Sequence, residues 1–110
     1  MANNYKSPVQ VEPTANTLTT LYTVPADTQS IFSAINICNT SSSSATFRIA
    51  FRPSGASIED KHYIIYDATI AGNDTYMINQ GMSMGATDVI SVYASTASVC
   101  FTGFYAEVTA

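Results

Sequence analysis

The chain has 110 residues, enough for one domain, and 46% of them are hydrophobic while only 11% are charged, a balance that argues against intrinsic disorder. Four Lys and Arg residues against eight Asp and Glu residues give a net charge of −4, without the basic patch that nucleic-acid binding requires. No apolar run approaches the roughly 20 residues that cross a bilayer, and the first residues lack the pattern of a signal peptide. We therefore expect synthesis in the cytoplasm and neither nucleic acid nor membrane as a partner.

Residues 1–16 are predicted to form an extended N-terminal arm, separate from a domain over residues 17–110. Pro8 and Pro13 remove two backbone donors, and the Asn and Gln residues around them favour turns over regular strands. The segment is then either a frayed terminus or an arm that orders against a neighbouring subunit. In the second case its expected anchors are Tyr5, Val9 and Val11.

From residue 17 onward the chain consists of short runs rich in Val, Ile, Phe, Tyr and Thr, separated by turn signals at intervals of about 8–12 residues. The clearest run is 46–52, where Phe47, Ile49 and Phe51 alternate with polar residues as in a half-buried strand. The expected strands, in chain order, cover 18–24, 31–37, 46–52, 62–67, 68–71, 75–79, 89–95 and 99–108. One face of the second run is expected to carry Ile31, Ser33, Ile35 and Ile37.

The end of the chain carries two further expectations. Residues 81–88 are predicted to be a loop in which Met82 or Met84 closes the end of the core, and the last two runs are predicted to pair as a hairpin across 96–98. No stretch keeps apolar residues at helical spacing without an interruption. We therefore predict an all-β fold: a single antiparallel β-sandwich of about eight strands, with jelly-roll and immunoglobulin-like topologies both open.

The sequence offers no constellation of residues for catalysis. His62 is the only histidine, no motif gives it a nucleophile or an orienting carboxylate, and we expect it to be structural. The carboxylates at the ends of runs are expected to form turns, and no calcium-loop spacing joins them: Asp27, Asp67, Asp74 and Asp88. We therefore expect no catalytic residue, no cofactor and no metal, in a protein that is not an enzyme.

Two cysteines, Cys38 and Cys100, are too few and too far apart for a metal knuckle or a redox motif. Each lies in an apolar run, where a free cysteine behaves as a small buried hydrophobe. The sequence leaves open whether the two form a disulfide, although a cytoplasmic origin disfavours one.

Five segments together resemble small virion proteins of tailed bacteriophages, and the resemblance covers roughly residues 17–108. These segments are TLYTVPA at 20–26, RPSGA at 52–56, DKHYIIYD at 60–67, DVISVYAST at 88–96 and GFYAE at 103–107. The resemblance implies a β-domain on the virion, as a capsid decoration (cement) protein or as a neck, tail or fibre part. It also implies oligomers, often trimers, and it carries no motif for a functional site.

We therefore expect a capsid decoration protein, made in the host cytoplasm and located on the virion, that stabilises the head without covalent bonds. Its expected partners are major capsid or other virion subunits and its own copies, with a homotrimer favoured. The arginines of run 46–52 are expected to project outward and to join the arm in this contact. The candidate interface residues are Tyr5, Val9, Val11, Arg48 and Arg52.

Two alternatives remain from the sequence alone. In the first, the chain is a tail, neck or fibre component that binds host glycans through loops 53–60 or 81–88. Alternatively, it is a cellular sandwich module, or a hydrolase whose activity would be lost with His62.

Overall fold

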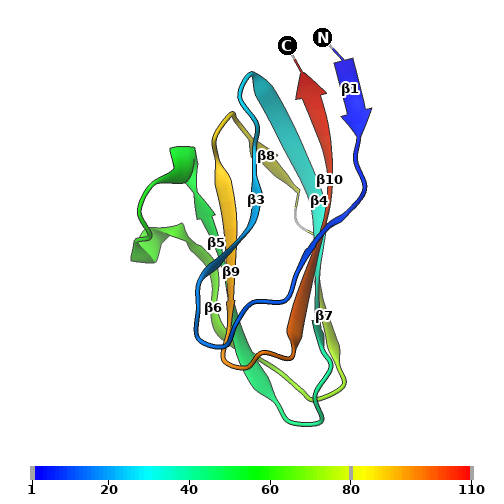
Figure 1. The fold of residues 1–110 in the computed structure, drawn as a ribbon, viewed down its shortest axis with the longest axis vertical. Coiled ribbons are helices and arrows are strands. Elements are labelled where there is room, and N and C mark those ends of the chain that lie inside the picture. Colours follow the sequence, from blue (N-terminus) through cyan, green and yellow to red (C-terminus); the bar gives the residue numbers. More distant parts are fainter. Residues whose placement is uncertain (1, 80, 110) are drawn as a thin grey trace.

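Two antiparallel sheets packed face to face make up the fold (Figure 1). The computed structural model describes residues 2–79 and 81–109, and within these ranges it contains no α-helix, only strands and two short 3-10 turns. The elements are β1 (Ala2–Tyr5), β2 (Val9–Val11), β3 (Thr19–Thr23), β4 (Thr28–Asn39), β5 (Ala45–Arg52), η1 (Pro53–Gly55), η2 (Asp60–His62), β6 (Tyr63–Ile70), β7 (Thr75–Ile78), β8 (Met82–Met84), β9 (Val89–Ala94) and β10 (Val99–Thr109). The predicted all-β sandwich of antiparallel sheets is thus confirmed.

The chain passes repeatedly from one sheet to the other. The first sheet has the order β1-β10-β4-β7, with β2 also paired to β10 and β8 also paired to β4. The second sheet has the order β3-β9-β5-β6. Strands β3, β4 and β5 therefore alternate between the sheets, as do β8, β9 and β10. Within the described residues, no helix is long and apolar enough to span a membrane.

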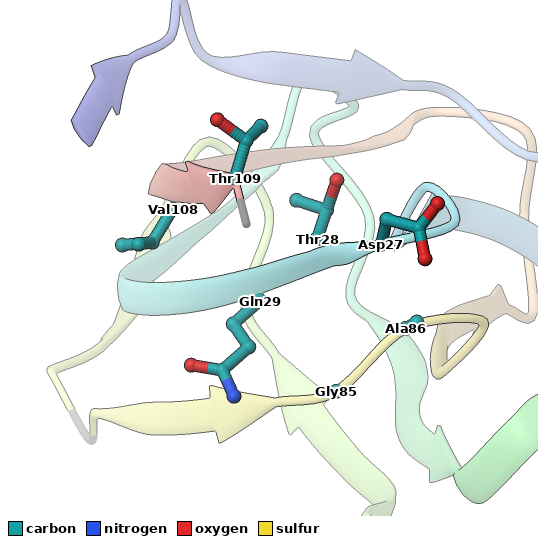
Figure 2. A pocket seen from close by; sticks show the side chains of 7 residues that line it. All are labelled: Asp27, Thr28, Gln29, Gly85, Ala86, Val108 and Thr109. Atoms are coloured by element: carbon teal, nitrogen blue, oxygen red, sulfur yellow. The ribbon is translucent and has the colours of Figure 1, made fainter. Parts of the chain in front are cut away.

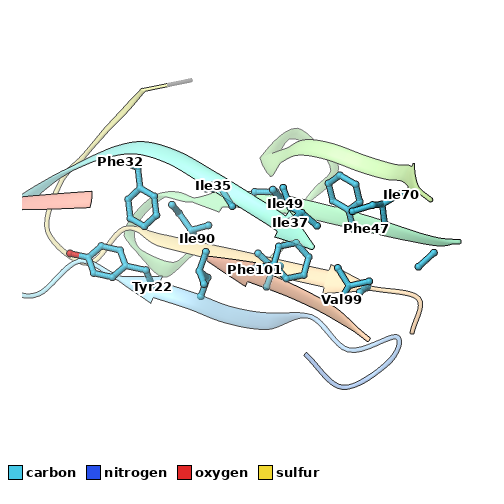
Figure 3. Close-up of a cluster of buried hydrophobic side chains, with 14 of the residues drawn as sticks. Tyr22, Phe32, Ile35, Ile37, Phe47, Ile49, Ile70, Ile90, Val99 and Phe101 are labelled. Atoms are coloured by element: carbon cyan, nitrogen blue, oxygen red, sulfur yellow. The ribbon is translucent and has the colours of Figure 1, made fainter. Parts of the chain in front are cut away.

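The core lies between the sheets and is built from the inward-facing side chains of the central strands (Figure 3). Alternation along β5 turns Phe47 and Ile49 inward, as the sequence predicted, and both are almost completely buried. The first sheet contributes Phe32 of β4 and Phe101 of β10, which have no exposed surface. Each such side chain stabilises the fold by roughly 1.5–3 kcal/mol relative to an exposed one.

The face predicted for β4 is wrong in its first half. Ile31 is 51% exposed and Ser33 also points to solvent, while Phe32 between them is fully buried. The pairing of β4 with β10 shifts register between Phe104 and Tyr105, so that one extra residue of β4 is accommodated as a bulge. Such a bulge exchanges the two faces of a strand from that point on, which explains why the later isoleucines of the run do face the core.

The last two long strands do not form the predicted hairpin. β9 pairs with β3 and β5 in the second sheet, while β10 pairs with β1, β2 and β4 in the first. Residues 95–98 cross the gap between the sheets, which is roughly 10 Å wide in sandwiches. A connection of this length fits a hairpin loop or a sheet-to-sheet crossing equally well, so the local sequence did not distinguish them.

The predicted loop 81–88 contains a short strand. Residues Met82–Met84 form β8, which pairs with Ser30–Phe32 of β4. Met84 is only 3% exposed and belongs to the core cluster, so the expectation that one of the two methionines closes the core is confirmed.

The N-terminal segment lies on its own sandwich where the structure describes it. β1 pairs with residues Ala106–Thr109 and β2 with Phe101–Gly103, both along β10. Val9 and Val11 pack against the core from this edge. The predicted arm therefore contains two short strands that pair with β10, and its contact with a neighbouring subunit stays a prediction.

A buried carboxylate ties both sheets and the N-terminal segment together near the chain ends. Glu107 of β10 is 7% exposed and accepts a hydrogen bond from the hydroxyl of Tyr22 in β3. The ammonium group of Lys6, between β1 and β2, lies 3.7 Å from the other oxygen of the Glu107 carboxylate. Burial first, and then the hydrogen bond to Glu107, raises the pKa of Tyr22 well above its ordinary value.

Candidate interaction surface

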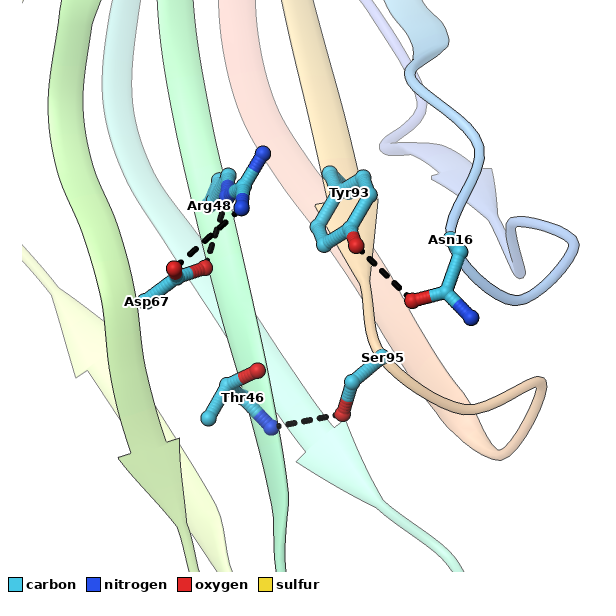
Figure 4. Close-up of polar contacts among 6 residues, drawn as sticks. All are labelled: Asn16, Thr46, Arg48, Asp67, Tyr93 and Ser95. Atoms are coloured by element: carbon cyan, nitrogen blue, oxygen red, sulfur yellow. Dashed lines mark hydrogen bonds and ion pairs between the residues drawn. The ribbon is translucent and has the colours of Figure 1, made fainter.

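A preassembled group of side chains stands on the outer face of the second sheet. The guanidinium carbon of Arg48 in β5 lies 4.2 Å from the ring centroid of Tyr66 in β6 and 4.2 Å from that of Tyr93 in β9. Its Nε and Nη2 donate to the two carboxylate oxygens of Asp67 at 2.6 and 3.2 Å (Figure 4). The Tyr63 ring lies 6.0 Å away. We call these five residues the Arg48 cluster.

The backbone explains why these side chains meet. Arg48 follows the inward-facing Phe47 and therefore points outward, and Tyr93 is its direct partner in the pairing of β5 with β9. Asp67 has a φ of 53°, in the left-handed region, where the register between β5 and β6 shifts. An aspartate tolerates this conformation better than most residues, and the bulge turns its carboxylate toward Arg48.

The ion pair between Arg48 and Asp67 keeps both side chains charged. The hydrogen bond from Arg48, more than any other interaction, lowers the pKa of the Asp67 carboxyl. The same bond raises the pKa of the Arg48 guanidinium above its already high value. The two rings hold the guanidinium plane in place, since a cation over a tyrosine ring gains about 0.5–1 kcal/mol at an exposed site. The cluster is therefore ordered before any partner arrives.

The neighbourhood of the cluster is also fixed. The hydroxyl of Tyr93 donates to Asn16 Oδ1 at 2.8 Å, which holds the end of the N-terminal segment beside this face (Figure 4). On the adjacent strands, the backbone N–H of Thr46 donates to the hydroxyl of Ser95 at 2.9 Å. Tyr66 remains 58% exposed, so the cluster presents an aromatic surface to solvent.

Of the other predicted interface residues, Arg52 lies on the same face of β5 as Arg48, as predicted, but outside the cluster. Arg52 donates to the carbonyl oxygens of Ala56 and Gly55 at 2.7 and 3.2 Å and to the hydroxyl of Ser91 at 3.2 Å, so it organises the turn after β5. Val9 and Val11 belong to the first sheet, so the structure does not bring them together with Arg48. The side chain of Tyr5 lies outside the described part of the structure.

Sequence reasoning missed an exposed apolar edge where β6 of one sheet lies near β7 and β8 of the other. Ile64 is 41% exposed and Met77 is 57% exposed. A hollow of about 150 Å³ opens here, lined by Ile35, Ile49, Ile64, Ile78, Gly81 and Met82. The signal was present in the run Tyr63–Tyr66, because a strand with apolar residues at successive positions must expose some of them when only one face is buried.

A second hollow, of about 300 Å³, lies at the end of the sandwich beside the loop after β8 (Figure 2). Its lining is Asp27, Thr28, Gln29, Gly85, Ala86, Val108 and Thr109. Asp27 is the only titratable group among these lining residues, and no aromatic ring stands beside it. The hollow offers hydrogen-bonding groups but no pair of acid and base.

His62 and Asp88 take part in turns. His62 is 6% exposed, and its Nδ1 accepts a hydrogen bond from the backbone N–H of Glu59 at 3.0 Å, which closes η2. Asp88 accepts from the backbone N–H groups of Ser54 and Gly85, both at 2.8 Å. Asp67 was expected to form a turn as well, but its side chain binds Arg48 inside β6. Within residues 2–79 and 81–109, no three His, Cys, Asp or Glu side chains are grouped as metal ligands.

No family model, curated protein or solved structure matches this chain. The likeness to phage virion proteins therefore stays an expectation from the sequence.

Proposed function

We propose that this protein is a structural component of a phage virion, most specifically a capsid decoration protein whose task is adhesion. The observation that carries the proposal is the Arg48 cluster, an ordered and partly exposed group of one arginine and three tyrosines with Asp67. Tyrosine and arginine dominate the residues that contribute most to protein interfaces. Because their geometry is already fixed, little conformational entropy is lost when a partner covers them.

The strand order supports a jelly-roll topology within this proposal. A jelly roll has eight strands. Here we count β1 and β2 together as the first of them, β7 and β8 together as the sixth, and β10 as the eighth. The first sheet, β1-β10-β4-β7, then contains strands one, eight, three and six in that order. The other contains the second, seventh, fourth and fifth, as expected for two interlocked Greek keys. An immunoglobulin fold would place its first two strands in one sheet. Jelly rolls are frequent in viral capsid proteins, which supports the proposal by analogy of fold.

The proposed mechanism is a non-covalent clamp between subunits. A specific interface buries roughly 800 Å² on each partner, whereas the whole exposed surface of this chain is 5773 Å². We place this area on the part of the outer face of the second sheet that carries the Arg48 cluster, where Tyr66 is 58% exposed. The low charge of the surface keeps the electrostatic repulsion between copies small.

The proposal predicts where the protein sits and which residues hold it there. Virions imaged with and without the protein should differ by density on the outer surface of the head. Arg48→Ala and Tyr66→Ala should weaken rebinding of the purified protein to depleted particles by on the order of 30-fold each, the effect of about 2 kcal/mol at a central interface residue. Lys61→Ala, which removes an exposed cation from η2, is the matched control and should bind normally.

Two results would contradict this assignment. Equal binding of all three variants would show that the Arg48 cluster is not the clamp. Density lost from the tail or neck rather than the head would move the protein to the alternative position. Sedimentation should also find an oligomer, with a trimer favoured, and a strict monomer at high concentration would argue against self-association.

The alternative, a tail, neck or fibre part that binds host glycans, is favoured by the hollow beside the loop after β8. Gln29 and Asp27 line it and present an amide and a carboxylate, groups that pair with sugar hydroxyls. Binding of the isolated protein to a glycan array, lost in Gln29→Ala, would support this function over cementing.

A further inference from the structure

The two cysteines lie opposite each other in the two central strands of the first sheet. Cys38 of β4 and Cys100 of β10 are direct register partners. Their neighbours in each strand are buried, while both cysteines are of intermediate exposure, so both thiols point to the outer face of the sheet. The two cysteines are unbonded in this structure.

The spacing of such a pair suits a disulfide. Directly opposed residues of antiparallel strands have Cα atoms about 4.5–5.5 Å apart, and disulfides join Cα atoms about 4.4–6.8 Å apart. Side chains of opposed residues also share one face, so neither strand has to turn for the sulfurs to meet. The sequence left this pairing open because 62 positions (100 minus 38) separate the two residues.

The surroundings of Cys100 give a small oxidant access to its thiol and set its pKa. A hollow of about 310 Å³ lies along the β2 edge, lined by Gln10, Val11, Glu12, Cys100, Phe101 and Thr102. The Cys100 thiol donates to the carboxylate of Glu12 at 3.3 Å. Partial burial first, and then this hydrogen bond, raises the pKa of Cys100 to about 11, so that the thiol form dominates near neutral pH.

We propose that Cys38 and Cys100 are a reversible disulfide site that cross-links β4 to β10 when a small disulfide such as oxidised glutathione is present. A thiolate of one cysteine attacks a sulfur of the oxidant, forming a mixed disulfide and releasing one reduced glutathione. The second cysteine, also as a thiolate, attacks the protein sulfur of the mixed disulfide and releases the second glutathione. The two thiol protons pass through solvent to the two departing thiolates. Two protein thiols are oxidised and one small disulfide is reduced.

The bond would fasten the middle of the first sheet. It closes a loop that contains β5 through β9, and a cross-link over so long a loop restricts the unfolded chain strongly. The cross-link leaves the outer face of the second sheet unchanged, so this inference does not depend on the proposed function. In a reducing cytoplasm the pair remains as thiols, and it closes in an oxidising medium.

The test uses the folded, unmodified chain, incubated with oxidised glutathione at mildly alkaline pH and then quenched with an alkylating reagent. The expected product is a chain without intermolecular disulfides that is lighter than the starting chain by two hydrogen atoms, with a peptide map that joins Cys38 to Cys100. Cys38→Ser and Cys100→Ser are the matched controls, and each should stop at a single glutathione adduct. Stable glutathione adducts on the wild-type chain, a disulfide-linked dimer or an unchanged mass would each overturn the proposal.

A second measurement tests the consequence of the bond. Urea unfolding of the oxidised and reduced proteins should give unfolding equilibrium constants that differ by on the order of 10³-fold, in favour of the oxidised form. Equal constants would overturn the inference that the bond fastens the sheet.

Discussion

A methyl group added at Gly103 should destabilise the sandwich, although alanine is normally favoured over glycine within a strand by about 0.5–1 kcal/mol. Gly103 lies in β10 at the point where the inner face of the first sheet meets the Phe32 ring. A Cβ atom there would lie 2.5 Å from Cε2 and 3.2 Å from Cζ of that ring, and 3.2 Å from Cγ1 of Val9. Carbon atoms in contact prefer separations of about 3.5–4.0 Å, so the ring would have to move by about 1 Å.

The ring has little room for that movement. Phe32 has no exposed surface, and its centroid lies 5.3 Å from the ring centroids of both Tyr22 and Tyr105. Overpacking of this kind destabilises a core by about 1–3 kcal/mol, which exceeds the gain expected from replacing glycine. The net loss is therefore about 1 kcal/mol or somewhat more.

Urea unfolding followed by circular dichroism measures this loss. With a slope of about 1–2 kcal/mol per molar urea for a chain of this size, the midpoint of Gly103→Ala should fall by roughly 0.5–1 M. Gly81→Ala is the matched control, because an added Cβ there meets only a backbone oxygen at 3.8 Å. In a Phe32→Leu background, Gly103→Ala should be less harmful. A Gly103→Ala protein as stable as the wild type would refute the packing argument.

Three further predictions concern titrating groups. The pKa of Tyr22 is raised in the folded protein, so the protonated Tyr22 hydroxyl stabilises the fold fully below pH about 10 and this stabilisation is lost as the pH rises further. Urea midpoints measured at increasing pH should therefore fall less steeply in Tyr22→Phe than in the wild type. The pKa of Asp67 is lowered in the folded protein, so the ionised carboxylate stabilises the fold above the ordinary pKa of aspartate, and this stabilisation is lost as the pH falls through the pKa of the folded protein. An NMR titration should find the Asp67 pKa below 3.8 in the wild type and higher in Arg48→Ala. Glu12→Gln removes the negative charge that helps to raise the Cys100 pKa, so alkylation of Cys100 near neutral pH should become several-fold faster, as followed by peptide mass mapping. An unchanged rate would show that the charge of Glu12 has no effect on the reactivity of Cys100.

The local pattern of the sequence was sufficient for most strands and for the two-sheet fold. Along β5 the alternation of Phe47 and Ile49 with polar residues placed both side chains in the core, as observed. The same reasoning failed for Ile31 and Phe32, because a bulge exchanges the inward and outward faces of β4 at this point. The residues of β4 alone do not indicate where such a bulge lies. Register faults of this kind depend on the partner strand, which a single run does not reveal.

The candidate surface was predictable only in part. The alternation of β5 indicated that Arg48 points outward. Its partners, however, come from β6 and β9, and Asp67 contacts it only because the Asp67 backbone itself adopts the left-handed conformation. Pairings between distant segments of the chain decide such contacts. For the same reason, the sequence did not indicate that Val9 and its neighbours join the edge of β10.

The position of β10 within its sheet bears on how the chain acquires its structure. Among the strands that the structure describes, β10 comes last in sequence, yet it lies between the first strands and β4 and pairs with all of them (Figure 1). The first sheet therefore cannot assemble while residues Val99–Thr109 are still inside the ribosome. Because β1 and β10 pair although they are far apart in sequence, the first sheet should close only after β10 has left the ribosome, over milliseconds to seconds, at the slow end for small domains. Until then the β4 edge is unprotected, and chaperones have their longest opportunity to bind it.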